Sequence, residues 1–465
     1  MPSLILAIDY GSTEFKAGLF DPQLLRIAEH SIGTPYLSQD ADRVELDPEG
    51  VWQATIELIK GICRRAGAEE QNVGTVAVTS QAQTFTLIDA NGRPALPLIS
   101  WIDKRATAEA RVLEQKLGRD FHRHCTFPKP VSQLQLAKML WLRTHRPETL
   151  AESHSVAFLP SFIAQRLAGI NVTDQNLAAM SGLFSLRHND WWPEALEICG
   201  VVRNQLPTLV RVGEATRAAS HPGGLDLPKD LLLVSAGNDQ TAGAFGSGCR
   251  HGESIVTLGT ALVVYRFAAD TPGPYTPAGC WGPYPGGGFY ELATRDEGCL
   301  ALDWAKEQIM PGESVETFMA AAERAADGVD ERTAFFYPDR IRTARAWSEQ
   351  RAARQMAFSA VEGITFSLRQ LLYDDLHCER GTTITAIGGG ARNDFWLQLV
   401  ADVAGAPVHR GNGDSLLGAA RMAATQPAAY SAPAGRAFEP GSTARRAVLA
   451  ARYEIWLESQ KEHAT

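Results

Sequence analysis

The sequence predicts an α/β protein made of two similar halves, and three observations support this prediction. Strand-like apolar runs alternate along the chain with amphipathic segments of helical periodicity, a pattern typical of sheets covered by helices. A hairpin design, in which two apolar runs flank a glycine and a small hydroxyl residue, occurs at the N-terminus and again in ESIVTLGTALVVYRF. The length of 465 residues suits two or three domains of roughly 100–200 residues each. We therefore expect a duplicated fold with a cleft between residues 1–242 and residues 243–465.

The first half is expected to begin with a hairpin, a helix and a further strand. The strands LILAID and FKAGLFD flank the turn YGSTE. In the next segment, ELDPEGVWQATIELIKGICRRAG, Asp47 is placed to cap a helix and Pro48 suits its first turn. The apolar face of this helix would carry Trp52, Ile56, Ile59 and Cys63. The strand VGTVAVTS is predicted after it.

The second half is expected to contain a long helix and a glycine-rich turn. The helix is predicted over ARQMAFSAVEGITFSLRQLLYDDL. Gly363 lies inside it and destabilises it by about 1 kcal/mol relative to Ala, so we expect another element to pack closely there. The strand TTITAI, the turn GGGA and the helix NDFWLQLVADVAG are predicted to follow.

Composition and charge exclude several classes of protein. The chain has 45% hydrophobic and 21% charged residues, as an ordinary globular protein does. Its net charge of −9 argues against a general nucleic-acid binder. No apolar run reaches the roughly 18 residues of a membrane helix, and MPSLILAIDYGS lacks the basic start of a signal peptide. We therefore expect no nucleic acid and no membrane among its partners.

The cysteines favour a cytoplasmic protein. Seven cysteines are scattered along the chain without a CxxC pair, so we expect neither a disulfide framework nor structural zinc. The segment HRHC at residues 122–125 has no second pair of ligands at a suitable spacing. We interpret it as a polar loop or helix surface.

The first hairpin carries a candidate phosphate and metal site. The bare backbone at Gly11 lets N–H groups approach a phosphate, and the hydroxyl groups of Ser12 and Thr13 add donors. Lys16 would supply positive charge, and Asp9 at the end of the first strand would hold Mg²⁺ directly or through water. The alternative interpretation is an ordinary hairpin turn.

Glycines in the second half mark two further candidate phosphate or nucleotide segments. Gly259 and Thr260 repeat the hairpin design, and two such hairpins would hold one polyphosphate from opposite sides. In GGGARNDFW the absent side chains leave room for a flat ring or a sugar, although Asn393 could simply cap the following helix. GxxxxGK[ST] is absent, as is GxGxxG after a strand, so a nucleotide would bind through another fold.

A carboxylate after an apolar strand is the candidate catalytic base. Asp239 follows LLLVSA and precedes a helix of small residues. There it would accept the proton of a substrate hydroxyl that attacks a γ-phosphate, while Gln240 orients that hydroxyl. The alternative is that Asp239 is only the N-cap of the helix.

Amide and indole side chains mark a candidate sugar site. Gln81, Gln83, Trp101, Asp103 and Arg105 stand at predicted strand ends. Amides suit sugar hydroxyls, and an indole face suits a carbon backbone. The alternative is that Trp101 belongs to the core, where tryptophan is usually found.

Taken together, these segments resemble the FGGY family of carbohydrate kinases, within the actin/Hsp70/hexokinase-like superfamily. DYGSTEFKAGLFD and VTLGTALVVY are similar to the two phosphate loops, SWIDKRA to the W-(N/Q)-D-x-R segment at the sugar site, AGNDQTAGAFGSG to the segment with the catalytic base, and AIGGGARNDFWLQLVADVAGAPV to the adenosine motif. The resemblance runs over nearly the whole chain. It implies two ribonuclease H-like (actin-like ATPase) domains with a catalytic cleft between them, the first binding sugar and the second nucleotide.

The resemblance implies phosphorylation of a sugar or polyol by ATP, with Mg²⁺ as cofactor. In this pattern Asp239 is the base and Asp9 anchors the metal. The implied nucleotide-binding residues are Gly11, Ser12, Thr13, Lys16, Gly259, Thr260, Gly298, Gly390 and Asn393. The implied substrate-binding residues are Gln81, Gln83, Trp101, Asp103 and Gln240.

Departures from the family pattern concern mainly the acceptor. Relatives that use xylulose tend to carry Q-M-H-G, and glycerol kinases Q-R-E-T, where this chain has Q-A-Q-T at residues 81–84. Ala82 and Gln83 thus leave neutral hydrogen bonding, and Ala261 in GTA lacks the hydroxyl of the commoner GTS. A ketopentose of the xylulose type is favoured; the alternatives are glycerol, erythritol or a fuculose-like deoxyketose, or a non-catalytic sensor of ATP and sugar. A homodimer is one candidate assembly.

Overall fold

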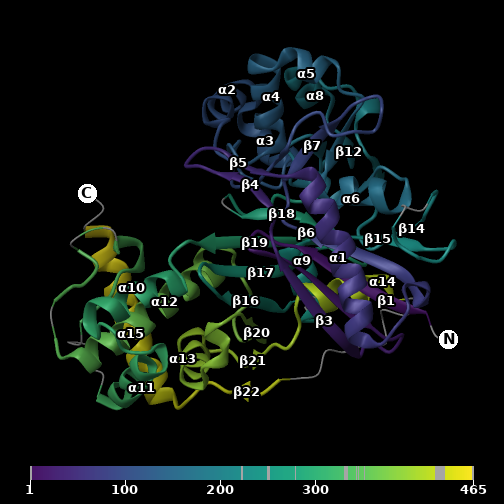
Figure 1. Ribbon diagram of the computed structural model, residues 1–465. Coiled ribbons are helices and arrows are strands. Elements are labelled where there is room, and N and C mark those ends of the chain that lie inside the picture. The colour runs from purple at the N-terminus through teal and green to yellow at the C-terminus, as the bar shows by residue number, and fades with distance from the viewer. Residues whose placement is uncertain are drawn as a thin grey trace. The chain divides into compact units, whose positions relative to one another are not determined.

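The chain folds into two compact units in the computed structural model (Figure 1). Unit 1 comprises Met1–Gly248, Ala269–Tyr290 and Gly413–Ser431, and unit 2 comprises Cys249–Ala268, Glu291–Asn412 and Ala432–Thr465. The structure describes residues 3–220, 224–248, 252–277, 279–328, 334–341, 343, 345–349, 351–424 and 435–462. The predicted assignment of sugar binding to residues 1–242 and nucleotide binding to residues 243–465 stays a prediction.

The main sheet of unit 1 has the strand order β14-β15-β6-β1-β2-β3. Its strands are β1 (Leu4–Tyr10), β2 (Glu14–Phe20), β3 (Arg26–Gly33), β6 (Val73–Ser80), β14 (Ala215–Arg217) and β15 (Leu232–Asn238). β1 and β2 form the predicted hairpin, with Asp9 opposite Lys16. β1, β6 and β15 run parallel, so their carboxyl ends lie at the same edge of the sheet.

Helices cover both faces of this sheet, because successive side chains of a strand point to opposite faces. The covering helices are α1 (Pro48–Ala66), α9 (Asp239–Gly246) and α14 (Ser415–Ala423). α1 shares a buried cluster with Leu6 and Ile8, whereas α9 and α14 share one with Ile5 and Ala7. Asp9 continues the alternation of Ile5 and Ala7, so it lies on the face of α9 and α14.

The rest of unit 1 contains a second sheet with the order β4-β5-β8-β7-β9 and several helices. These elements are β4 (Tyr36–Gln39), β5 (Val44–Leu46), β7 (Phe85–Ile88), β8 (Leu98–Ile99), β9 (Ser155–Phe158), α2 (Thr107–Leu117), α3 (Phe121–His124), α4 (Gln135–His145), α5 (Pro147–Ala151), α6 (Leu159–Ala168), α7 (Gln175–Ala179) and α8 (Pro193–Cys199). His124 is buried, bonds Ser185 Oγ at 2.7 Å and stacks on Trp192. The predicted polar surface is therefore wrong for His124 and Cys125, which are buried, because these contacts satisfy the imidazole inside the protein, whereas Arg123 is exposed as predicted.

Two predicted helices are confirmed in detail. The Asp47 carboxylate accepts hydrogen bonds from the backbone at the start of α1, and Pro48 is its first residue. The predicted long helix of the second half is α12 (Ala353–Gln370). A Cβ at Gly363 would lie 2.3 Å from the carbonyl oxygen of Phe336, so the predicted close packing at this glycine is also confirmed.

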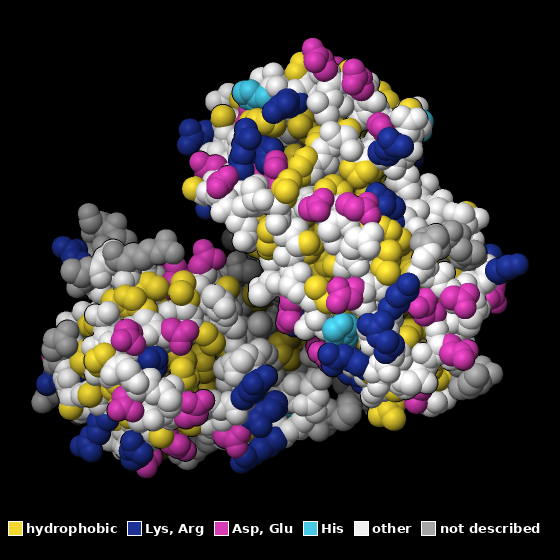
Figure 2. Space-filling view, viewed as in Figure 1, with side chains coloured by type: hydrophobic (Ala, Val, Ile, Leu, Met, Phe, Trp, Pro, Cys, Tyr) yellow, Lys and Arg dark blue, Asp and Glu magenta, His cyan; other side chains and the backbone are white. Residues whose placement is uncertain are grey.

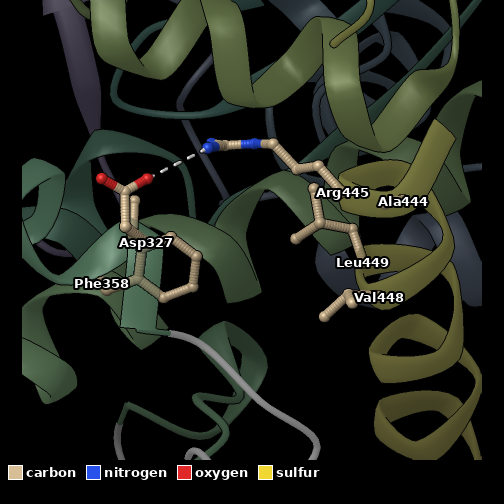
Figure 3. A pocket seen from close by; sticks show the side chains of 7 residues that line it. Asp327, Phe358, Ala444, Arg445, Val448 and Leu449 are labelled. Atoms are coloured by element: carbon tan, nitrogen blue, oxygen red, sulfur yellow. Dashed lines mark ion pairs between the residues drawn. The ribbon is translucent and has the colours of Figure 1, made fainter. Parts of the chain in front are cut away.

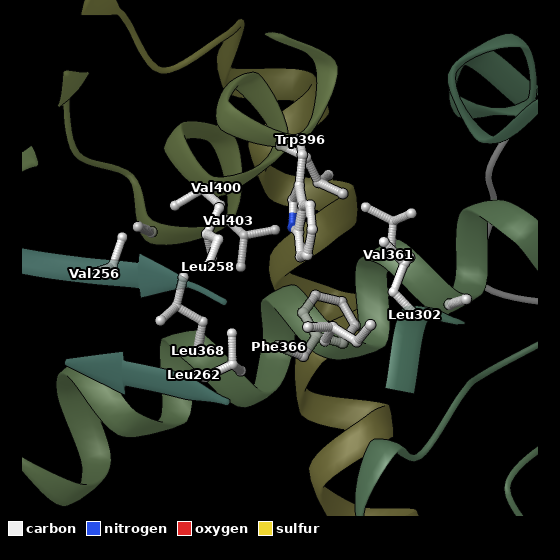
Figure 4. Close-up of a cluster of buried hydrophobic side chains, with 14 of the residues drawn as sticks. Val256, Leu258, Leu262, Leu302, Val361, Phe366, Leu368, Trp396, Val400 and Val403 are labelled. Atoms are coloured by element: carbon white, nitrogen blue, oxygen red, sulfur yellow. The ribbon is translucent and has the colours of Figure 1, made fainter. Parts of the chain in front are cut away.

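Unit 2 is built on a sheet in which the strands follow the order β19-β17-β16-β20-β21-β22. The strands are β16 (Ser254–Leu258), β17 (Leu262–Ala269), β19 (Phe289–Arg295), β20 (Ile384–Ile387), β21 (Val408–Arg410) and β22 (Ala437–Phe438). The helices are α10 (Cys299–Ile309), α11 (Val315–Ala325), α12, α13 (Asp394–Ala404) and α15 (Thr443–Glu462). A buried cluster that includes Val256, Leu258, Phe366 and Trp396 joins the strands to the helices (Figure 4).

The surface is charged but mixed. Basic and acidic side chains are interspersed over the face seen in Figure 2. The net charge of −9 is therefore not gathered into one acidic patch on this face. Within the part of the chain that the structure describes, no helix combines the length and the apolar character that crossing a membrane requires.

Candidate active site

Three parallel strands bring Asp9, Gln81 and Asp239 to one edge of the unit 1 sheet. Asp9 of β1 pairs with Thr79 of β6, and Asn238 at the end of β15 pairs with the next residue of β6. Gln81 and Asp239 each follow directly after these strands. Ligands commonly bind outside the carboxyl ends of parallel strands. The register therefore explains how residues far apart in the sequence come to share one site.

Asp239 is the first residue of α9, and its neighbour Asn238 caps this helix. The Asn238 side chain accepts the N–H of Thr241 at 3.0 Å, whereas Asp239 Oδ1 accepts the adjacent N–H of Gln240 at 2.8 Å. The alternative in which Asp239 is the N-cap is therefore wrong, because Asn238 occupies that position. Asp239 is partly exposed and Gln240 is exposed, so a ligand could reach both side chains.

A buried polar network, which the sequence did not reveal, holds the end of β15. Asp174 accepts a hydrogen bond from the N–H of Gly237 at 3.0 Å, and Asn176 Oδ1 accepts one from the N–H of Asn238 at 3.0 Å. Asp174 also caps α7, and an Asp before a helix start was the only available signal in the segment VTDQN. The network fixes the backbone that carries Asp239.

Asp9 is buried beside the start of α14. Its Oδ2 accepts a hydrogen bond from Ser415 Oγ at 2.5 Å, and its Oδ1 has no hydrogen-bond partner among the described residues. Burial raises the pKa of Asp9 to about 6. Burial, with the charge of Asp9 added to it, raises the pKa of Asp239 to about 7. The two carboxylates therefore act on each other, and a bound cation would favour their charged forms.

The donor set of Asp9 fits Mg²⁺. This ion prefers oxygen ligands, keeps several waters and is bound by one or two carboxylates together with substrate phosphates. Asp9 offers a buried carboxylate oxygen that has no hydrogen-bond partner within the described part of the chain. Among the described residues, no three His, Cys, Asp or Glu side chains gather around a common point, so water and phosphate oxygens would complete the coordination. Lys16, opposite Asp9, pairs with Glu14 at 3.1 Å.

The loop of the first hairpin contacts the predicted sugar-binding residues. A Cβ at Gly11 would lie 2.8 Å from the Glu14 carbonyl oxygen, so the turn requires glycine. Ser12 Oγ accepts a hydrogen bond from the indole of Trp101 at 2.9 Å and lies 3.4 Å from the side-chain oxygen of Gln81. Ser12 thus stands between the predicted phosphate site and the predicted sugar site.

Gln83 combines a strained backbone with a buried amide that is unpaired within the described chain, two features typical of ligand-binding residues. Its φ of 65° lies in the left-handed region, which a non-glycine residue adopts at a cost of order 1–3 kcal/mol. Its side chain is buried, and its Nε2 has no hydrogen-bond partner among the described residues. An unpartnered buried donor is unfavourable, so a sugar hydroxyl at Nε2 would relieve it.

Asp103 is engaged within the protein. It is fully buried; its Oδ2 accepts the N–H of Val44 at 2.8 Å, and both of its oxygens accept hydrogen bonds from the Arg105 guanidinium at 2.7 and 2.9 Å. Arg105 also pairs with Glu45 at 2.5 Å. This arrangement suits a residue that shapes the segment around Trp101 more than one that touches the sugar itself.

In unit 2 several predicted nucleotide-binding residues converge through backbone contacts. The N–H groups of Gly298 and Cys299 donate to the carbonyl oxygens of Thr260 at 3.0 Å and Gly259 at 2.7 Å. A Cβ at Gly298 would lie 2.5 Å from the Gly259 oxygen. The start of α10 therefore docks on the loop of the second hairpin only because residue 298 is glycine.

Gly390 and Asn393 lie between β20 and α13. A Cβ at Gly390 would lie 2.9 Å from the Cβ of Leu258, which ends β16 beside the same hairpin. Asn393 Oδ1 accepts the N–H of Trp396 at 2.9 Å, which confirms that Asn393 caps α13. Its contact with a nucleotide stays a prediction.

A cavity of about 280 Å³ lies beside α12 and α15 in unit 2 and is lined by other residues (Figure 3). Its lining is Ala326, Asp327, Phe358, Ala444, Arg445, Val448 and Leu449. Arg445 pairs with Asp402 at 2.6 Å and approaches Asp327 at 3.9 Å. None of the predicted site residues lines this cavity, so it is not part of the candidate site.

Two α/β units, hairpins with glycine turns and a pair of interacting carboxylates are the features expected of an ATP-dependent phosphotransferase with an actin-like fold. The sequence narrows this class to a family. The FGGY family of carbohydrate kinases matches with its N-terminal domain at residues 4–246 and with its C-terminal domain at residues 255–426. The chain belongs to this family and is an ATP-dependent carbohydrate kinase.

Individual relatives act on different substrates by name. The chain is 25% identical to a gluconokinase of Bacillus subtilis (87% of this chain, 83% of the relative), 26% to a xylulose kinase of Escherichia coli (90% and 89%) and 28% to a glycerol kinase of Gloeobacter violaceus (97% and 95%). A solved xylulose kinase from Lactobacillus acidophilus has the same fold, with a TM-score of 0.88 at 19% identity over 100% of this chain and 99% of the other. The two-domain actin-like fold is thereby confirmed.

Proposed function

We propose that the enzyme transfers the γ-phosphoryl group of ATP to a neutral ketopentose of the xylulose type. The observation that carries this proposal is the amide of Gln83, which is buried on a strained backbone and unpartnered among the described residues. It is a neutral donor next in sequence to Thr84, whose hydroxyl accepts the Trp101 N–H. Several relatives are xylulose kinases by name. A carboxylated acceptor would favour a cation at residue 83, and the amide does not supply one.

In this proposal Asp239 is the general base. Its pKa of about 7 suits a group that takes a proton near neutral pH, when the sugar hydroxyl attacks the γ-phosphorus. Gln240 and Gln81 would orient that hydroxyl, and Trp101 would pack on the carbon chain. Asp9 would hold Mg²⁺, which when bound neutralises phosphate charge.

The nucleotide would be held mainly by backbone groups. Gly259 and Thr260 would face the phosphates, and Gly298 and Gly390 would let the neighbouring segments pack closely enough to form the nucleotide site. Gly11, Ser12, Thr13 and Lys16 would contact the phosphates from the first hairpin. Asn393 would lie at the adenosine end.

An ADP-release assay over a panel of ketopentoses, deoxyketoses, aldonates and polyols tests the substrate. We expect the highest kcat/KM with a ketopentose. A higher kcat/KM with gluconate would contradict the neutral-acceptor argument. Preference for glycerol, erythritol or fuculose would instead support the alternative of a polyol or deoxyketose kinase, with the same base and metal residues.

A further inference from the structure

A buried lysine contacts residues 100–105, which carry Trp101 and are called the acceptor segment below. This lysine takes no part in the proposed chemistry. Lys138 of α4 is fully buried, and its Nζ donates a hydrogen bond to the Ser100 carbonyl oxygen at 2.6 Å. Removing an ammonium group from water is unfavourable, and lysine is almost never fully buried unless it is paired. An apolar side chain would fill the same space without this penalty. Packing alone therefore does not explain why a lysine occupies this position.

The acceptor segment supplies the charges that act on Lys138. Burial lowers the pKa of Lys138 to about 7; the charge of Asp103 opposes this shift and that of Arg105 adds to it. Glu45 of β5 is engaged with Arg105 at 2.5 Å. Lys138 therefore sits against an ion-paired segment whose carboxylate favours the protonated ammonium.

Several charged groups on α4 itself and on its neighbours α2 and α5 have other contacts or are exposed. Glu109 of α2 lies 3.5 Å from His145 of α4, and Arg143 of α4 donates to two carbonyl oxygens of α8. Glu148 of α5 is exposed. The electrostatic environment of Lys138 is thus set mainly by the segment that carries Trp101.

Ser100 directly precedes Trp101, the residue proposed to pack on the sugar. The Trp101 backbone N–H donates to Thr84 Oγ1 at 3.1 Å, and its indole donates to Ser12 Oγ at 2.9 Å. These two bonds hold Trp101 from the side of the site. The hydrogen bond from Lys138 holds the preceding residue of the same segment, through the carbonyl oxygen of Ser100.

We propose that Lys138 is a positioning residue for the sugar, whose ammonium group holds residues 100–103 so that Trp101 keeps its contact with the acceptor. This inference rests on the proposed function, which places the acceptor beside Trp101. A neutral amine donates a weaker hydrogen bond to Ser100 and no longer opposes the charge of Asp103. The affinity for the sugar therefore falls as Lys138 loses its proton.

Lys138→Met tests this role, because it removes the charge and keeps a long side chain. We expect the KM for the best acceptor to rise about 10- to 100-fold, as for a small displacement of a binding group, with the KM for ATP within about twofold. The wild-type rise of acceptor KM between about pH 7 and 9 should disappear in the variant. Lys116→Met, the same change at an exposed position of α2, should behave as wild type. An unchanged acceptor KM, or an equal rise for ATP, would overturn the proposal.

Two further measurements keep the test decisive. Should Lys138→Met fail to fold, calorimetric titration of the wild-type enzyme with the acceptor replaces it, and a Kd that stays constant from about pH 6 to 9 would overturn the proposal. Trp101→Ala separates the two levels of inference. If Trp101→Ala leaves the acceptor KM unchanged, the proposed acceptor site is wrong; if it raises this KM and Lys138→Met does not, only the role of Lys138 fails.

Discussion

The hairpin loops of the two units are held in different ways. In unit 1, residues 11–13 receive hydrogen bonds from side chains, including the indole of Trp101 and the hydroxyl of Tyr36. In unit 2, residues 259–261 receive the backbone N–H groups at the start of α10, where Gly298 lets the helix approach. The first loop therefore depends on which side chains surround it. The second loop depends on the absence of a side chain at residue 298.

This difference separates charge from shape in the candidate site. The edge of the unit 1 sheet holds two carboxylates whose pKa values are raised by burial and by each other. The second hairpin presents backbone groups in a space that a single methyl group would fill. Substitutions that change charge in unit 1 should alter the chemical step, whereas substitutions that add volume in unit 2 should alter ATP binding.

Asp239→Asn should have the largest effect. Loss of a general base lowers kcat by about 10²- to 10⁴-fold, while the Kd for ATP should stay within about twofold of wild type. Steady-state kinetics and ATP titration measure the two quantities. Asp42→Asn, which changes an exposed acid of the same unit, is the matched control. Substantial turnover by Asp239→Asn would show that another group takes the proton.

Asp9→Asn should act next most strongly, and through the metal. We expect the Mg²⁺ concentration for half-maximal activity to rise about 10- to 100-fold, the range typical when groups that support a metal site are altered. A magnesium titration at saturating ATP and acceptor measures this shift. A loss of activity that Mg²⁺ does not restore in part would argue against the assignment of Asp9 to the metal.

Gly298→Ala should weaken ATP binding, because its Cβ would meet the Gly259 carbonyl oxygen at 2.5 Å. Overpacking of this kind costs about 1–3 kcal/mol, which corresponds to a rise of roughly 5- to 150-fold in the KM for ATP if the hairpin absorbs the displacement. Gly33→Ala at the end of β3 is the control, since a Cβ there would meet no atom of the described residues within 4 Å and Gly33 belongs to none of the predicted sites. Equal effects of the two changes on ATP binding would contradict the shape argument.

The pH dependence should show the smallest effect and the one most specific to unit 1. Asp239 must be ionised to accept a proton, so kcat/KM should fall as the pH drops through about 7. Asp9→Asn removes a negative charge that raises the pKa of Asp239, so the acid limb should move to lower pH. The residual activity of this variant is measured across the pH range. A limb that stays in place or moves upward would show that Asp9 does not act on the base.

The sequence predicted local features better than contacts between distant segments. The cap at Asp47 and the first hairpin follow from residues that are close in sequence. The packing at Gly363 follows from residue type, because a glycine inside a helix is costly unless another element packs against it. The bond from Ser415 to Asp9 joins residues 406 positions apart, and no local pattern around Ser415 predicts it. The helix cap at Asn238 was missed because Asn and Asp are equally good caps, and only geometry chooses between them.

The hydrogen bond from Ser415 to Asp9 has a consequence for how the protein is made. Unit 1 includes Gly413–Ser431, so α14 reaches the ribosomal exit only after most of unit 2 has been synthesised. Until then, the sheet face that carries Ile5, Ala7 and Asp9 lacks one of its covering helices. Part of that apolar face therefore gains its cover, and Asp9 its bond from Ser415, only after most of the chain has been made.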